Sequence, residues 1–185
     1  MANFTNIRGE SDNAQLLEWA TMLLAEYQNA RDFQLARVSL ERGDPAAVQA
    51  LEKIAAYDER QGTPVSHDFM LRLHGLWLAL AKAQFGDLRA GQALIAETPM
   101  DCRMCVDFRG RIAAIAGNTT DAEKWFAQAI EMAPKLPQVY IDRGQARLER
   151  AELASALTDA AKAASLSPHD GDAWKTLGRC AREAG

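Results

Sequence analysis

The residues of this chain best suited to chemistry are Cys102 and Cys105, which form a CxxC pair. At the start of a helix such a pair can act in redox chemistry, because the helix dipole and free N–H groups lower a thiol pKa. A thioredoxin-like site would follow a strand, and no strand pattern precedes this one. A zinc site needs about four ligands, and the third cysteine, Cys180, lies far along the chain. A thiol or metal protein is therefore only the third hypothesis.

The histidines give no stronger case for chemistry. His67 and His74 lie seven residues apart, so they can share one face of a helix, but no third ligand is spaced to join them. His169 lies in a turn after Pro168. The sequence has no Gly-rich phosphate loop, G-x-S-x-G or H-E-x-x-H motif. We expect no catalytic residue, no cofactor and no metal, and hence a protein that is not an enzyme.

Composition narrows the class of protein further. The chain has 185 residues, 48% hydrophobic and 25% charged, as in a soluble globular protein. Its net charge of -4 argues against nucleic-acid binding, which needs clustered Lys and Arg. The excess acid is N-terminal, since residues 1–66 carry 6 basic and 10 acidic side chains and residues 67–185 carry 15 of each.

Targeting signals are not evident in the sequence. The longest apolar stretch, LHGLWLALAKAQF, contains His74 and Lys82 and is too short to span a bilayer. The N-terminal residues lack the basic run and apolar stretch of a signal peptide. Three cysteines make no disulfide framework and favour a reducing compartment. We therefore expect a cytoplasmic protein without membrane insertion.

The elements that must position any site follow a 34-residue period in the C-terminal half. Gly110, Gly144 and Gly178 stand 34 residues apart, as do Pro134 and Pro168. Four residues before each glycine is a bulky residue, in turn Val106, Tyr140 and Trp174. Such a repeat predicts stacked supersecondary units.

This frame resembles the tetratricopeptide repeat (TPR), whose pattern is W-x2-L-G-x2-Y, then A-x3-F, then P. The closest match to the first half is WKTLG at residues 174–178, and Ala122, Phe126 and Pro134 supply the second half. The resemblance covers residues 103–185. There are departures that we expect to loosen the packing: Arg109 and Arg143 occupy the Leu position, and Ala160 replaces the Phe.

The physical reading of the frame is that Gly and Ala let helices approach, Phe126 fills the space between them, and Pro ends the second helix. The resemblance implies an all-α, right-handed, TPR-like solenoid of antiparallel helix pairs with an N-terminal helical extension. Two parts are expected: an N-terminal helical extension or degenerate repeat at 1–66, and a TPR-like array at 67–185. The array comprises an irregular repeat 67–100, repeats 103–136 and 137–170, and a C-terminal capping helix 171–184.

Upstream of the clear repeats the sequence predicts further helices. Residues 12–42 form one helix or two, and 45–60 form another after an Asp44 N-cap. Residues 67–85 form a long apolar helix, with a short partner at 88–97. The segment 61–66 is the expected connection to the array. Residues 120–123 read as a capping box at the start of a helix.

The resemblance also implies where a partner binds. In TPR proteins the first helices of successive repeats line a concave groove that holds a peptide or a helix. A clamp for the carboxylate tail of chaperones is not expected, because it uses Asn and the groove positions here have none. Carried over position by position, the partner-binding residues are Arg72, Met104, Asp107, Arg111, Gln138, Ile141, Gln145, Asp172, Lys175 and Arg179.

Two function hypotheses lead. The first is a non-catalytic protein–protein interaction module, an adaptor, chaperone or assembly subunit. The second is a structural subunit that self-assembles into a homo-oligomer through its N-terminal helices, where Leu16, Leu23 and Tyr27 form an apolar stripe. The sequence leaves open the partner, the pathway, the oligomeric state, and whether the N-terminal helices cap the array, fill the groove or dimerise.

Overall fold

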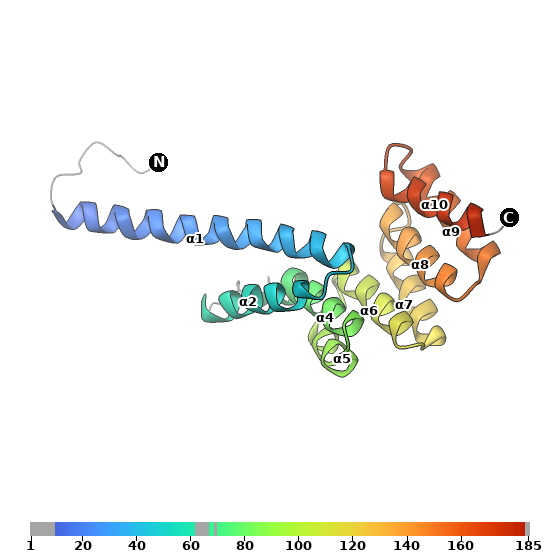
Figure 1. Ribbon diagram of the computed structural model, residues 1–185, viewed down its shortest axis with the longest axis horizontal. Coiled ribbons are helices and arrows are strands. Elements are labelled where there is room, and N and C mark those ends of the chain that lie inside the picture. Colours follow the sequence, from blue (N-terminus) through green and yellow to red (C-terminus); the bar gives the residue numbers. More distant parts are fainter. Residues whose placement is uncertain (1–9, 62–66, 69, 184–185) are drawn as a thin grey trace.

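Helices form every element that the structure, a computed structural model, describes, namely residues 10–61, 67–68 and 70–183 (Figure 1). The all-α prediction is confirmed for these residues. Their order is α1 (Glu10–Glu41), α2 (Ala46–Gln61), a π-helical turn η2 (Met70–His74), α4 (Gly75–Gln84), α5 (Leu88–Glu97), α6 (Arg103–Ile115), α7 (Thr119–Met132), α8 (Pro137–Glu149), α9 (Leu153–Leu166) and α10 (Gly171–Glu183).

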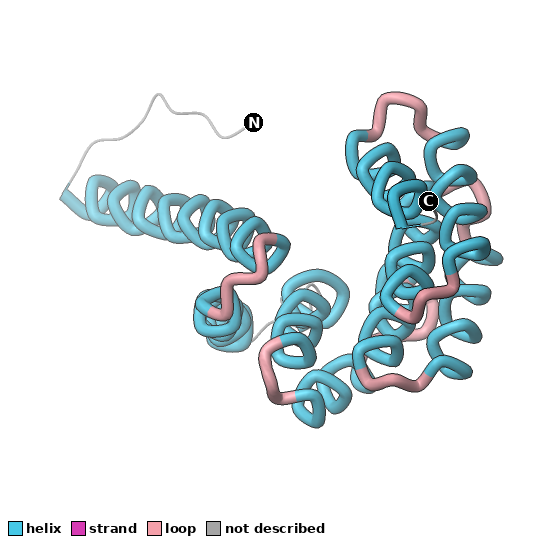
Figure 2. The backbone as a smooth tube through the Cα atoms, turned by 45° about the vertical axis from the view of Figure 1, so that its right-hand side comes forward, coloured by secondary structure: helices cyan, strands magenta, loops and turns pink. Residues whose placement is uncertain are grey.

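Adjacent helices pair into hairpins that share one turn geometry. The pairs are α1–α2, α4–α5, α6–α7 and α8–α9, and Figure 2 shows the later pairs stacked side by side along an arc. After each first helix one residue has a positive φ, and the N–H of the next residue donates to the carbonyl five residues before it. This is the Schellman type of helix end, which satisfies otherwise unpaired carbonyls. The positive-φ residues are Gly43, Gly86, Gly117 and Ala151.

Ala151 is the one non-glycine among those four turn residues, with a φ of 60°. The left-handed region costs an L-residue with a Cβ about 1–2 kcal/mol. Ala151→Gly is therefore expected to raise the free energy of unfolding by about 1 kcal/mol, measured by urea denaturation. The reciprocal change at the equivalent turn, Gly117→Ala, should lower it by a similar amount. A less stable Ala151→Gly variant would contradict the assigned turn.

Close approach of helices depends on glycine at one repeat position more than at the others. A Cβ added to Gly110 would lie 2.8 Å from the ring of Phe126, so α6 and α7 meet there without space for a side chain. At Gly144 the nearest atom would be 3.4 Å away, an ordinary contact, and at Gly178 nothing lies within 4 Å. Among the three periodic glycines, only Gly110 is required by packing.

A glycine outside the 34-residue frame is just as tightly packed. A Cβ on Gly91 of α5 would lie 2.5 Å from the carbonyl oxygen of Ala79 on α4. Gly91 is the fourth residue after the turn residue Asp87, as Ala122 is the fourth after Asn118. The α4–α5 hairpin thus uses the same small position, displaced in sequence because this repeat is irregular.

The two arginines at the Leu position make polar contacts between helices. Arg143 donates two hydrogen bonds to the buried carboxylate of Asp159, at 2.9 and 2.7 Å. Arg109 donates to the carbonyl of Thr98 at 2.7 Å. Charge-assisted hydrogen bonds thus connect neighbouring helices at the position where the TPR pattern has an apolar contact.

Several local expectations need correction. For residues 12–42 the first of the two alternatives is confirmed: α1 runs as one helix over Glu10–Glu41, because the run contains no Gly or Pro to interrupt it. Within the expected apolar helix of 67–85, the structure describes the π-helical turn η2 (Met70–His74) followed by α4 (Gly75–Gln84), and residue 69 lies outside the described part. The N-cap of α7 is Asn118, whose side-chain oxygen accepts from the N–H of Asp121 at 3.2 Å, so the capping box at 120–123 is wrong. Of the expected connection 61–66, residues 62–66 lie outside the described part of the chain.

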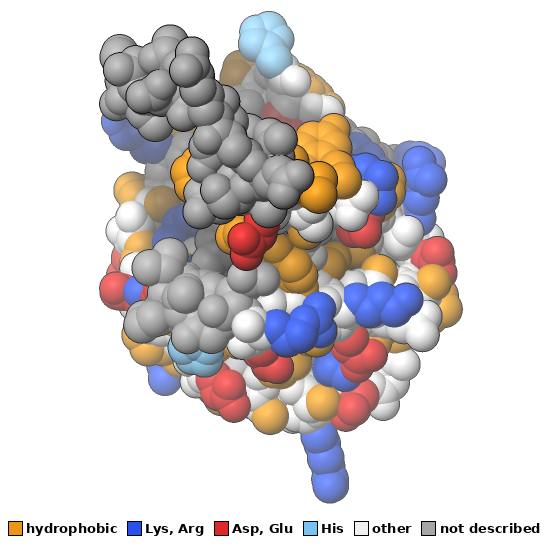
Figure 3. Space-filling view, turned by 90° about the vertical axis from the view of Figure 1, so that its left-hand side faces the viewer, with side chains coloured by type: hydrophobic (Ala, Val, Ile, Leu, Met, Phe, Trp, Pro, Cys, Tyr) orange, Lys and Arg blue, Asp and Glu red, His pale blue; other side chains and the backbone are white. Residues whose placement is uncertain are grey.

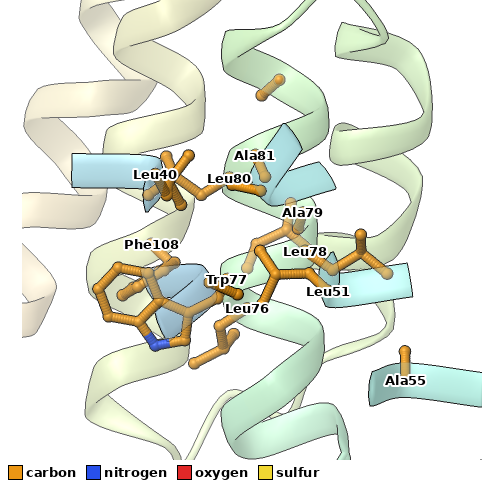
Figure 4. Packing of buried hydrophobic residues seen from close by; sticks show 14 of the residues in the cluster. Leu40, Leu51, Ala55, Leu76, Trp77, Leu78, Ala79, Leu80, Ala81 and Phe108 are labelled. Carbon is orange, nitrogen blue, oxygen red and sulfur yellow. The ribbon is translucent and has the colours of Figure 1, made fainter. Parts of the chain in front are cut away.

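The largest apolar core joins the N-terminal helices to α4, α5 and α6. Leu40 of α1 and Leu51 of α2 pack with Trp77 of α4 and Phe108 of α6 (Figure 4). The rings of Trp77 and Phe108 meet edge to face, with centroids 5.1 Å apart. The C-terminal end of α1 is thereby anchored beside α4 and α6, whereas its N-terminal half projects away from the hairpins (Figure 1).

Candidate functional site: a groove between α1, α4, α6, α8 and α10

The end of α1, together with α4, α6, α8 and α10, encloses a groove of about 420 Å³. First helices of successive hairpins supply most of its lining, because residues at the same repeat position face the same side of the stack. All predicted groove residues except Arg72 lie along it: Met104, Asp107, Arg111, Gln138, Ile141, Gln145, Asp172, Lys175 and Arg179.

Arg72 does not line this groove. It lies in η2, where its guanidinium pairs with Asp68 at 2.8 Å and with Asp101 at 3.1 Å. The irregular repeat shifts its register, so the position-by-position transfer from the regular repeats fails there.

Some lining residues were missed from sequence although a signal existed. Phe108, Asp142 and Thr176 stand 34 residues apart, one position after the predicted set. Arg103 lies one helical turn before Asp107, on the same face of α6. In contrast, Arg37, Leu40 and Glu41 close the groove from α1. No repeat position relates these to the rest, so only the packing of α1 places them there.

A pair of carboxyl groups forms the floor of the groove. Asp107 of α6 is 1% exposed and Asp142 of α8 is 5% exposed. Burial raises the pKa of Asp107 well above its ordinary value, and the charge of Asp142 and a hydrogen bond to it act in the same direction. The charges of Arg111 and Arg103 oppose this rise in the pKa of Asp107. The carboxyl group of Asp107 therefore keeps its proton at pH values where a free Asp would be ionised.

Three buried polar atoms of groove residues have no hydrogen-bond partner. They are Oδ1 of Asp107, Nη1 of Arg103 and Nε of Arg37. Buried polar atoms are nearly always paired, because an unpaired one costs about 1–3 kcal/mol. The groove residues thus leave one acceptor and two donors unpaired.

The cations of the groove differ in how they are held. Arg111 lies 4.7 Å over the ring of Phe108, and its Nε is 3.8 Å from Asp142. Arg37 lies 4.3 Å over the ring of Trp77. Within the described residues, Arg103, Lys175 and Arg179 form no ion pair. Their charge is thus uncompensated at the groove surface.

The cysteines and histidines considered for chemistry lie outside this groove. The structure joins Cys102 and Cys105 by a disulfide, contrary to the expectation of reduced thiols, whereas Cys180 is free and buried. The disulfide links Cys105, in the first turn of α6, to Cys102, the N-cap residue that precedes the helix. His74 is buried against Asp58 and the ring of Phe33, and His67 is exposed. Across the described residues, no three His, Cys, Asp or Glu side chains are grouped so that they could hold a metal ion.

None of the helices in the described ranges combines the length and apolar character that a membrane span requires. A comparison with known families and curated proteins gives no assignment, because no protein-family model matches the chain and no curated protein matches it.

Proposed function

We propose that this chain is a non-catalytic interaction module, a TPR-like solenoid that holds a peptide or helix of a partner protein in the groove. An adaptor, chaperone or assembly subunit would use such a surface. The observation that carries the proposal is the convergence of the residues picked by the 34-residue period on a single groove. A concave surface with a few polar groups and apolar side chains between them suits a polypeptide ligand.

A catalytic role is not part of the proposal, because the polar groups of the groove are distributed along several helices. The exposed side chains Gln138, Lys175 and Arg179 instead provide separate contacts along the groove.

The test is a quantitative pull-down from native lysate with a Gln138→Ala/Lys175→Ala/Arg179→Ala variant. These side chains are truncated at exposed positions, so folding should be retained. We expect partners that the wild type captures to be lost or strongly reduced. The matched control is Lys124→Ala/Lys162→Ala, on the second helices α7 and α9 and outside the groove, which should capture as the wild type does. Equal capture by all three proteins would refute the groove as the binding site.

A second candidate function, self-assembly, is favoured by the exposed apolar side chains of α1. Leu17, Leu24 and Val38 recur at multiples of seven residues and are 69, 56 and 42% exposed. Leu23 and Tyr27 are 66 and 70% exposed, whereas the side chain of Leu16 lies outside the described part. Figure 3, viewed from the side where α1 projects, shows apolar side chains at the surface among charged ones. A large exposed apolar surface commonly marks an interface.

The charges of α1 favour an antiparallel pairing of two copies. Residues 10–28 contain four acidic side chains and no basic one, whereas residues 29–42 contain three arginines and two acids. Antiparallel helices would bring the acidic half of each against the more basic half of the other.

Light scattering after size-exclusion chromatography tests this second candidate. We expect a wild-type dimer, and a monomer for Leu24→Glu/Val38→Glu, because two charges would be buried in the α1 pair. Met132→Glu, at another exposed apolar position, should leave the mass unchanged. A wild-type chain that stays monomeric at all concentrations would exclude self-assembly through α1.

A further inference from the structure

The groove has more unpaired positive than negative charge. Arg103, Lys175 and Arg179 form no ion pair within the described residues, and Arg37 contacts only aromatic rings and Gln34. On the acidic side, Asp142 is 3.8 Å from Arg111, and the pKa of buried Asp107 is raised well above its ordinary value. This leaves Glu41 and Asp172 as the unpaired carboxylates. The unpaired side chains of the groove therefore carry a net positive charge, although the net charge of the whole chain is negative.

We infer that the groove binds a segment of another protein through its Asp and Glu side chains, and that the Asp107–Asp142 pair makes this binding weaken as the pH rises. The inference rests on the proposed function and adds the chemistry of the ligand. Carboxylates of the ligand would pair with Arg103 on one wall and with Lys175 and Arg179 on the other. Guanidinium and ammonium groups are the strong hydrogen-bond donors for carboxylates.

The raised pKa of Asp107 makes the proposed binding depend on pH. Below its raised pKa the Asp107 carboxyl group is neutral, and above it the floor gains a second carboxylate charge beside Asp142. The second charge would face an acidic ligand in a partly desolvated groove, where like charges repel strongly. The charged groups around the pair are Arg103 and Arg111 on α6, Arg37 and Glu41 on α1, and Asp172, Lys175 and Arg179 on α10. Gln138 of α8 donates a hydrogen bond to Asp142 at 3.1 Å.

The unpaired buried atoms of the groove side chains agree with a polypeptide ligand. Nη1 of Arg103 and Nε of Arg37 lack acceptors, and Oδ1 of Asp107 lacks a donor. An acidic segment supplies carboxylate acceptors for the donors, and its backbone N–H groups can supply the donor. A nucleic acid fits less well, because Trp77 and Phe108 are 8% and 3% exposed and present no open ring face for base stacking.

The probes are three blocked peptides, each built from repeated Glu-Glu-Leu, Gln-Gln-Leu or Lys-Lys-Leu units to a length of about 12 residues, close to the 13 residues of α8. Blocked ends exclude recognition of a terminal carboxylate. Fluorescence anisotropy with the full chain is expected to give a Kd for the acidic peptide about tenfold or more below that of the neutral one, and no binding of the basic one. Arg103→Ala/Lys175→Ala/Arg179→Ala should abolish this preference, and Lys124→Ala/Lys162→Ala should retain it.

Measuring the Kd of the acidic peptide as a function of pH tests the role of the carboxyl pair. Between about pH 5 and about pH 9, where the ligand carboxylates stay ionised, the wild-type Kd for the acidic peptide should rise with pH. Asp107→Asn keeps the shape of the side chain and removes the titration, so its Kd should be independent of pH. If Asp107→Asn does not fold, as judged by circular dichroism, Asp142→Asn provides a second variant. It leaves Asp107 buried but removes the neighbouring charge that helps to raise the Asp107 pKa, so the rise in Kd should move to lower pH.

Each contrary result overturns the inference. Equal affinity for the acidic and neutral peptides, or tighter binding of the basic peptide or of a single-stranded oligonucleotide, would overturn the ligand class. An unchanged wild-type Kd across the pH series would overturn the role of the pair. Binding of a peptide of residues 10–28 more tightly than the acidic probe would assign the groove to a second copy of this chain. If the lysate pull-down depends on the groove while the acidic probe fails, the proposed function stands and only this inference falls.

Discussion

Phe126→Ala is expected to lower the free energy of unfolding by about 3–5 kcal/mol, the usual cost of deleting a fully buried aromatic side chain. The Phe126 side chain is 0% exposed and fills the space between α6 and α7. Its neighbours in this core are small or already packed, with Ala122 and Ala129 on the same helix and Val139 on α8. They cannot move in to fill the void, so the cavity term should be large. Urea denaturation followed by circular dichroism measures the loss.

Two comparisons make this prediction specific to the contact with Gly110. Met132→Ala removes an apolar side chain from the same helix at a 40% exposed position and should cost less than about 1 kcal/mol. Gly110→Ala should be destabilising in the wild type, because the new Cβ would lie 2.8 Å from the Phe126 ring, and well tolerated when Phe126 is already Ala. A Phe126→Ala variant as stable as Met132→Ala would show that this ring does not hold the hairpins together.

Asp159→Ala is expected to lower the free energy of unfolding by about 3–5 kcal/mol, because it leaves the half-buried Arg143 without a counter-charge and removes one of the two partners of Arg147. The Asp159 side chain is 3% exposed and accepts from Arg143 and Arg147, whose side chains are each 18% exposed. Arg147 also pairs with Glu123 at 2.6 Å, so the network joins α7, α8 and α9. Thermal and urea unfolding should both record the loss.

A second substitution separates the unpaired charge from the lost volume. Arg143→Leu/Asp159→Ala should be more stable than Asp159→Ala alone, because the double variant no longer buries an unpaired Arg143. The control is Asp32→Asn, which removes an acid paired with Arg31 where both side chains are at least half exposed, and which should change stability by less than about 1 kcal/mol. A double variant less stable than the single one would mean that the Arg143 side chain stabilises through its packing instead.

The helical class and the faces of α6, α8 and α10 that line the groove could be predicted from the sequence. A 34-residue period repeats the same local features: a turn after each first helix, a small residue four positions after the turn, and equivalent positions on the same helix face. Residues such as Asp107, Ile141 and Lys175 therefore fall along one groove. The prediction failed at Arg72 because η2 and the displaced Gly91 break the period in that hairpin.

The sequence determined which residues share a repeat position, because helical periodicity and turn chemistry act over a few neighbouring residues. Tertiary structure alone decided which unlike segments meet: the end of α1 with Arg37 and Glu41 closing the groove, the ion pair of Arg143 with Asp159, and the approach of Asp107 to Asp142 on the floor. These contacts depend on how whole helices pack, and packing is set by the summed burial of many side chains rather than by any local pattern. The raised pKa of Asp107 follows from that packing, since burial and the neighbouring Asp142 carboxylate act on it only when α6 and α8 stand side by side.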